Sequence, residues 1–77
     1  MIPAQCRAAR GLLDWTQGKL AEAAGLLFST VVKFERSERA VAAGAVQAMK
    51  RSLVKAGVEF IAEYGGGPSV RLRKASE

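Results

Sequence analysis

The stretch TQGKLAEAAGLLFSTVVKFERSER, residues 16 to 39, carries the signals of two short helices joined by a tight turn. Thr16 is a good N-cap residue, because its hydroxyl can accept a hydrogen bond from a free backbone N–H at the start of a helix. Gly25 is a natural stop, because glycine readily adopts the left-handed conformation in which many helices end. We therefore expect one helix over residues 17–24 and a second over residues 28–36.

The second of these helices begins with large apolar side chains, and their spacing assigns several of them to the core. Placed at 100° steps, Leu27, Val31 and Phe34 fall on one side of the helix, where we expect them to pack inward. Phe28 falls near the boundary, and the opposite side carries Ser29, Val32, Lys33 and Arg36. Phe28 and Val32 are therefore left without a role in the core.

Helical spacing also occurs before and after this stretch. Pro3 suits the opening turn of a first helix, which we expect to end near Asp14. A fourth helix is expected over about residues 42–56, and it ends at Gly57 with an inner face of Val46, Met49, Leu53 and Ala56. The sequence thus predicts a mainly α protein with four short helices.

The pattern changes from helical to alternating after the fourth helix. In VEFIAE, residues 58–63, every second residue is apolar and alternates with Glu59, Ile61 and Glu63, and in VRLR, residues 70–73, apolar residues alternate with Arg71 and Arg73. The segment YGGGPS, residues 64–69, supplies turn residues between them. We expect a C-terminal β-hairpin over residues 58–73 and a flexible tail over residues 74–77.

Net charge differs between the two parts of this 77-residue chain. Residues 1–57 contain nine basic and four acidic side chains, whereas residues 58–77 contain three of each. The excess of +5 therefore belongs to the helical part, which favours a polyanionic partner such as nucleic acid. A basic surface kept for solubility would carry the same charge.

Composition argues against several other classes of site. The chain has no histidine and one cysteine, Cys6, so neither a structural metal nor an internal disulfide is expected. Catalytic motifs are missing as well, so we expect no enzyme, no cofactor and no small-molecule ligand. A secretory signal is lacking, and the longest apolar run, residues 40–46, is too short for a bilayer. We expect a cytoplasmic protein without a membrane partner.

The opening stretch resembles the helix-turn-helix of the bacterial and phage Xre/Cro-type repressors. The matching positions are Thr16, Gln17, Leu20, Ala21, Ala24, Gly25, Thr30, Val31, Phe34, Glu35 and Arg36. The resemblance covers residues 4–56 and implies a lambda-repressor-like bundle. It implies that residues 1–57 form a helix-turn-helix DNA-binding domain, whose recognition helix over residues 28–36 enters the major groove.

The same resemblance implies roles for individual residues. Base contacts fall to Phe28, Ser29, Val32 and Lys33, and phosphate contacts fall to Gln17, Thr30, Arg36 and Arg39. Lys33 suits the acceptors of guanine, whereas Phe28 and Val32 suit the methyl group of thymine. Arg10 and Glu35 are implied to form a structural ion pair between the first helix and the recognition helix.

The implied function is a transcriptional regulator, acting as repressor or autoregulator, that reads an inverted-repeat operator in double-stranded DNA. One recognition helix makes few base contacts, so we expect a homodimer. Its interface is expected on the fourth helix and the hairpin, with Ile61 and Phe60 as candidate contacts. The structural alternative is an Ile61 packed within its own monomer.

Departures from the family pattern keep a second function open. Leu27 stands where the family usually has a serine or threonine N-cap. With the apolar Phe28 and Val32, this favours a regulatory protein partner, as in an antiactivator or an antitoxin. The basic residues Lys33, Arg36 and Arg39 favour DNA instead.

Overall fold

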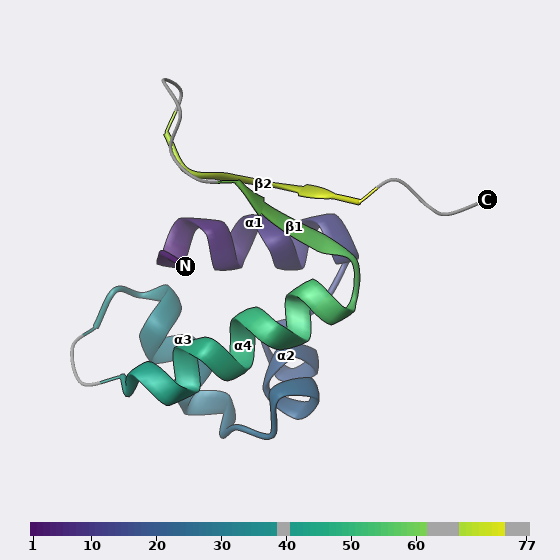
Figure 1. Ribbon diagram of the computed structural model, residues 1–77. Coiled ribbons are helices and arrows are strands. Elements are labelled where there is room, and N and C mark those ends of the chain that lie inside the picture. The colour runs from purple at the N-terminus through teal and green to yellow at the C-terminus, as the bar shows by residue number, and fades with distance from the viewer. Residues whose placement is uncertain (39–40, 62–66, 74–77) are drawn as a thin grey trace.

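The computed structural model describes residues 1–38, 41–61 and 67–73, which form four helices and one hairpin. The helices are α1 (Pro3–Leu13), α2 (Gln17–Ala24), α3 (Phe28–Glu35) and α4 (Ala43–Lys55). They are followed by the antiparallel strands β1 (Val58–Ile61) and β2 (Ser69–Leu72). In Figure 1, β2 runs above α1 and β1 slants across α1. The expected mainly helical protein with a C-terminal hairpin is confirmed. Of the helices in the described ranges, none has the length and apolar content that a bilayer crossing requires.

The ends of α2 follow from the local sequence signals. The Thr16 hydroxyl accepts a hydrogen bond from the backbone N–H of Lys19 at 3.0 Å. Gly25 ends the helix in the left-handed conformation, with a φ of 68°. The expected cap and the expected stop are both confirmed. α1 ends in a similar way at Asp14, whose φ is 58°; aspartate tolerates this conformation better than most side chains.

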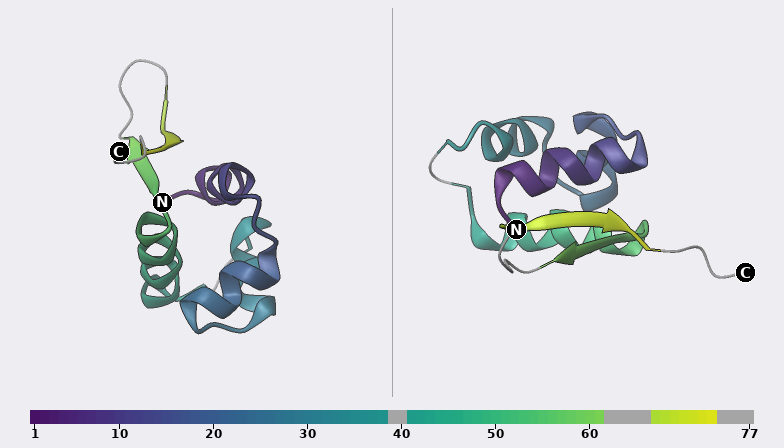
Figure 2. Two further views of the ribbon diagram at one scale, coloured as in Figure 1. Left: turned by 90° about the vertical axis from the view of Figure 1, so that its right-hand side faces the viewer. Right: turned by 90° about the horizontal axis from the view of Figure 1, so that it is seen from above.

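The core takes a few side chains from every element except β2. Its fully or nearly buried apolar members are Cys6, Ala9, Leu20, Ala21, Val31, Phe34, Met49, Leu53 and Val58. Trp15, which joins α1 to α2, is half-buried and packs against them. Figure 2 shows the four helices arranged around this core, with the hairpin lying across one side of it.

Two apolar residues expected in the core lie outside it. Leu27 is 73% exposed, because it is the N-cap of α3 and has an extended backbone (φ −70°, ψ 145°). The 100° step that placed Leu27 beside Val31 does not apply before the helix begins. Ala56 is also exposed, because it is the C-cap residue of α4, at the point where the chain turns toward β1.

The hairpin keeps the alternation that the sequence predicts. Val58 pairs with Leu72 and Phe60 pairs with Val70, on the side that faces the helices. The opposite side carries an ion pair between Glu59 and Arg71. Leu72 is nevertheless 46% exposed, at the end of the hairpin farthest from its loop. The expected loop residues 62–66 and the expected tail 74–77 lie outside the described residues.

The first helix and the last strand are held together. The side-chain amide of Gln5 on α1 donates a hydrogen bond to the backbone carbonyl of Ser69 on β2, at 3.2 Å. These residues are 64 positions apart in the sequence. The contact closes the hairpin onto the helical part of the molecule.

Candidate functional site

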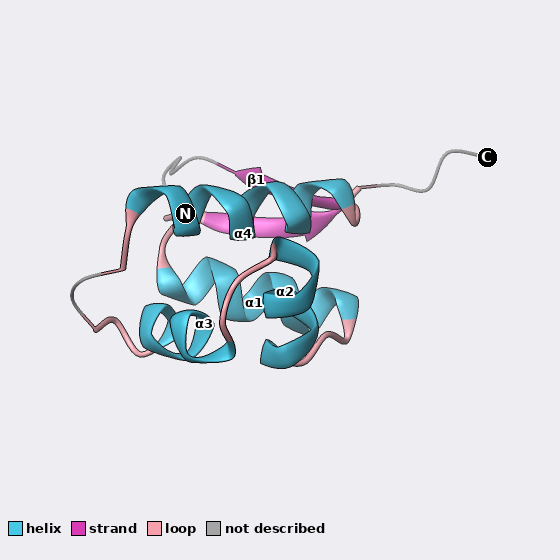
Figure 3. Ribbon diagram, turned by 90° about the horizontal axis from the view of Figure 1, so that it is seen from below, coloured by secondary structure: helices cyan, strands magenta, loops and turns pink. Residues whose placement is uncertain are grey.

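α3 buries one face and exposes the other. Val31 and Phe34 are buried, whereas Phe28, Ser29 and Lys33 are exposed. Figure 3 shows α2 and α3 on the same side of the molecule, joined by a short turn. Three of the four residues expected to contact bases therefore share an accessible surface. The fourth, Val32, is half-buried, and so is the expected phosphate contact Thr30.

The start of α3 lies beside the start of α2. The ring of Phe28 comes within 4.0 Å of the point that a Cβ on Gly18 would occupy. Leu27 offers no side-chain hydrogen bond to cap α3, and its side chain projects into solvent next to Phe28, which is 57% exposed. These two residues form a small apolar surface that we call the Leu27–Phe28 patch.

The other end of α3 is held through the buried carboxylate of Glu35. Arg10 donates hydrogen bonds from Nε to Oε2 at 2.6 Å and from Nη2 to Oε1 at 2.7 Å. The Cys6 thiol donates to Oε2, and the Gln17 amide donates to Oε1, both at 3.1 Å. We call these four residues the Glu35 cluster. The Arg10–Glu35 pair is the ion pair that was expected, and it joins α1 to α3.

Two further hydrogen bonds surround the Glu35 cluster. Arg7 donates from Nη1 to the backbone carbonyl of Glu35, and Arg10 donates from Nη1 to the carbonyl of Trp15 at 3.0 Å. The side chain of Arg10 is 18% exposed and that of Glu35 is 3% exposed, so water screens this pair only weakly. α1 and α2 thus fix the C-terminal end of α3 together.

Protonation states in the Glu35 cluster follow from its contacts. Burial alone would raise the pKa of Glu35, but hydrogen bonds from Arg10, Cys6 and Gln17 outweigh it and lower the pKa. Burial, together with the hydrogen bond to Glu35, raises the pKa of Cys6, which therefore stays a neutral thiol and a donor. The hydrogen bond to Glu35 raises the pKa of Arg10. The cluster therefore contains one carboxylate facing one guanidinium.

The residues expected to contact phosphate are arranged in different ways. Gln17 turns one amide N–H inward to Glu35, which leaves its second N–H for an external acceptor. Arg36 is exposed at the end of α3, with its Nη1 3.9 Å from Oε2 of Glu38. Arg39 lies outside the described residues.

The residues expected at a dimer interface differ in their contacts. Phe60 is half-buried and packs against the core of its own chain. Ile61 is half-buried and lies on the side of the hairpin that carries Glu59 and Arg71. Ile61 is therefore better placed than Phe60 for a contact with a second chain.

Sequence reasoning missed the contributions of Cys6, Arg7 and Gln17 to the anchoring of α3. The spacing on α1 contained a signal, because Arg7 lies three positions and Cys6 four positions before Arg10. Residues at these spacings share one face of a helix. A side chain on another element that pairs with Arg10 is therefore also within reach of Cys6 and Arg7.

Comparison of the chain with models of known protein families and with curated proteins gave no match.

Proposed function

We propose that this chain is a helix-turn-helix protein of the Xre/Cro type that regulates transcription, as repressor or autoregulator, by binding double-stranded DNA. The observation that carries the proposal is the exposed face of α3, which carries Phe28, Ser29 and Lys33 and whose first residue, Phe28, lies beside the start of α2. A helix that enters the major groove needs such a face, with contacts near its N-terminal end.

The chemistry of this face suits direct reading of base pairs. Lys33 can donate to O6 and N7 of guanine, and the Ser29 hydroxyl can donate or accept. The ring of Phe28 suits the methyl group of thymine, which projects into the major groove. Arg36 and the second amide N–H of Gln17 supply donors for phosphate oxygens.

The Glu35 cluster supports the same function through rigidity. Base readout depends on side chains whose positions are fixed relative to the DNA backbone. Hydrogen bonds from Arg10 and Gln17 tie the end of α3 to α1 and α2, so α3 enters the groove as part of the whole bundle.

A homodimer is part of the proposal. One α3 makes too few base contacts for high specificity, whereas two, about 34 Å apart, read an inverted repeat. The proposed interface is formed by α4 and the hairpin, with Ile61 as its candidate apolar contact. Phe60 contributes chiefly to its own core.

Fluorescence anisotropy with the DNA upstream of its own gene, across a salt series, tests the proposal. Specific binding should weaken steeply with salt, because phosphate contacts release counterions. Lys33→Ala should weaken it by about 10-fold or more if the guanine contact is made. Lys55→Ala removes the same charge at the exposed C-terminal end of α4 and should have little effect. Phe28→Ala should relax the preference at a thymine.

Weak binding to any sequence, equal for Lys33→Ala and Lys55→Ala, would contradict the proposal. A second candidate would then lead, namely a protein-binding module acting as antiactivator or antitoxin. The observation that favours it is the Leu27–Phe28 patch, whose residues are 73% and 57% exposed. Contiguous exposed apolar side chains are typical of protein interfaces.

A further inference from the structure

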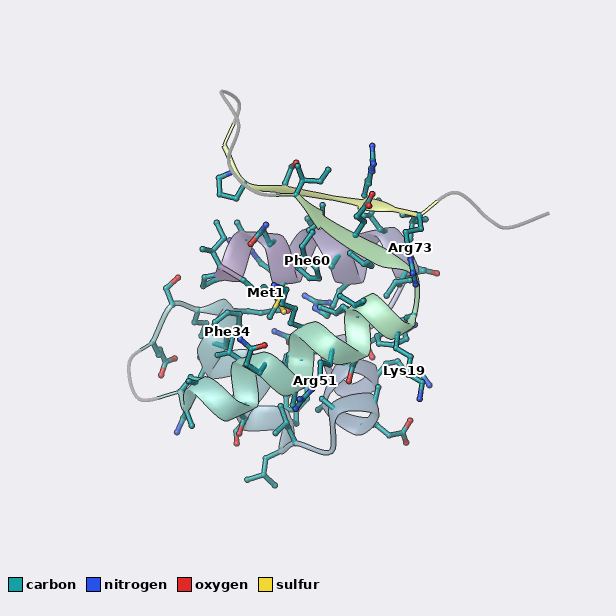
Figure 4. The ribbon with its side chains drawn as sticks, viewed as in Figure 1. Met1, Lys19, Phe34, Arg51, Phe60 and Arg73 are labelled. Atoms are coloured by element: carbon teal, nitrogen blue, oxygen red, sulfur yellow. The ribbon has the colours of Figure 1, made fainter. Side chains whose placement is uncertain are left out.

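Gly18 is the second residue of α2, and its backbone conformation does not call for glycine. Its φ is not positive, unlike that of Gly25, which ends the same helix. Inside a helix glycine is less favourable than alanine, because folding removes more conformational freedom from it. Gly18 is exposed, and Figure 4 shows the side chain of the adjacent Lys19 projecting outward from the bundle. The space beside Gly18 supplies a reason for glycine that the backbone does not.

That space is taken by the ring of Phe28. A Cβ at Gly18 would lie 4.0 Å from Cδ1 of the ring and 3.8 Å from Oγ1 of Thr16. Both are ordinary van der Waals distances, so one methyl group fits without moving the ring. Side chains on a helix lean toward its N-terminus, where Thr16 lies. A side chain branched at Cβ fills two of the three staggered positions there, which leaves it little freedom to avoid both neighbours.

The contact with α2 decides where the ring of Phe28 lies. Phe28 is the first residue of α3 and is 57% exposed, and Leu27 before it projects into solvent. Gly18 lets the ring rest against the first turn of α2 instead of standing free in solvent. The same turn carries Gln17, a proposed phosphate contact. The ring and that phosphate contact are therefore neighbours on one surface.

We propose that Gly18 is a positioning residue that selects which thymine Phe28 contacts. A small residue here holds the ring next to the first turn of α2, so the thymine lies beside the phosphate that Gln17 contacts. A branched side chain turns the ring away from α2 and removes this preference, while Ser29 and Lys33 keep their places on α3. The inference rests on the proposed DNA-binding function and adds a residue outside α3 to its specificity.

A second role of glycine gives a different result. Glycine also permits close approach of a ligand to the backbone, and any side chain would then weaken binding to every DNA sequence. Gly18→Ala separates the two roles, because its methyl group keeps an ordinary distance to the ring. Gly18→Ala should keep both the affinity and the base preference. A loss of affinity in Gly18→Ala that is equal for all sequences would assign the glycine to the DNA backbone and overturn the proposal.

The position of the ring is measured first, by nuclear magnetic resonance without DNA. Nuclear Overhauser effects should connect the Phe28 ring with the α protons of Gly18 in the natural chain, and with the introduced methyl group in Gly18→Ala. In Gly18→Val the ring should move, with resonance changes confined to the starts of α2 and α3. An unchanged ring position in Gly18→Val would overturn the proposal.

Gly44→Val is the matched control. Gly44 is the second residue of α4 and is exposed, as Gly18 is in α2. A Cβ at Gly44 would meet no atom of the described residues within 4 Å. Gly44→Val therefore makes the same change of side chain in the same helical position, and it should leave the Phe28 ring where it is.

The base preference is measured next, by fluorescence anisotropy with the operator upstream of its own gene. In copies of the operator, one thymine at a time is replaced by uracil, which lacks only the methyl group. The natural chain should lose about 4-fold in affinity at the thymine that Phe28 contacts. Gly18→Ala and Gly44→Val should keep this loss at the same thymine. Gly18→Val should abolish it or move it to another thymine.

A double substitution tests whether Gly18 acts through the ring. Phe28→Ala removes the ring, so adding Gly18→Val to it should bring no further change in affinity or base preference. A further loss in the double variant would show that Gly18 acts in another way, and it would overturn the proposal.

Failure of this inference and failure of the proposed function give different results. DNA binding with the same uracil effect, at the same thymine, in Gly18→Ala and Gly18→Val would overturn this inference and leave the function standing. Binding without any sequence preference in the natural chain would contradict the function, and this inference would fall with it.

Discussion

The two ends of α3 differ in almost every respect. At the N-terminal end, Leu27 and Phe28 are exposed and no side chain caps the helix. At the C-terminal end, Glu35 is buried and receives hydrogen bonds from Arg10, Cys6 and Gln17. One end is fixed by the neighbouring helices, and the other is available to solvent.

This difference separates two properties of α3, namely the stability that it gives to the fold and the surface that it offers to a partner. Stability depends on the buried end, where most changes leave a charge or a donor without its partner. The exposed end can change its side chains at little cost to the fold. Variants at the two ends therefore test whether anchoring and recognition are independent.

The largest effect is expected from Glu35→Ala. It leaves the largely buried Arg10 guanidinium without a counter-ion, and should lower the free energy of unfolding by about 3–5 kcal/mol. Urea unfolding followed by circular dichroism measures this. Glu38→Ala is the control, because Glu38 is exposed and lies 3.9 Å from an exposed Arg36; its effect should stay within about 0.5 kcal/mol. Similar losses in both variants would show that the cluster is not the anchor.

Acid should also weaken the anchoring of the C-terminal end of α3, and it should lower the free energy of unfolding by less than Glu35→Ala does. The pKa of Glu35 is lower in the folded chain, because the hydrogen bonds to it outweigh burial. The unfolded chain therefore takes up this proton first, and the stabilisation is complete above an unfolded-state pKa of about 4.3. It is lost as pH falls through the folded-state value. Urea midpoints measured below about pH 4 should fall more steeply for the natural chain than for Glu35→Gln; parallel curves would argue against this linkage.

The smallest change in the free energy of unfolding is expected at the exposed N-terminal end of α3, and there the substitution should stabilise the protein. Leu27→Ser places a hydroxyl where it can accept a hydrogen bond from a free N–H of α3, and Leu27 makes few contacts that would be lost. The free energy of unfolding should rise by about 1 kcal/mol. Leu27→Ala lacks the acceptor and should bring no such gain. Equal stabilities of the two variants would show that α3 does not need a cap.

The elements of the fold could be predicted because their signals are local. Thr16 and Gly25 mark the ends of α2 by their own chemistry, and alternation after Gly57 marks the hairpin. The error at Leu27 arose because helical periodicity was extended one residue beyond the helix. The conformation at a cap depends on the turn before it, which periodicity does not describe.

The site could be predicted only in part, because its contacts join distant segments. The spacing on α3 identified Ser29 and Lys33 as surface residues. The inward turn of Gln17 could not be predicted, because it depends on how closely α2 approaches Glu35.

The hydrogen bond from Gln5 to Ser69 has a consequence for the making of the protein. During synthesis α1 leaves the ribosome before β2, so part of the surface against which α1 packs arrives 64 positions later. Domains whose contacts join distant positions fold more slowly than those with local contacts. The nascent chain therefore exposes one side of its first helix until β2 has emerged, and during that interval a chaperone can bind it.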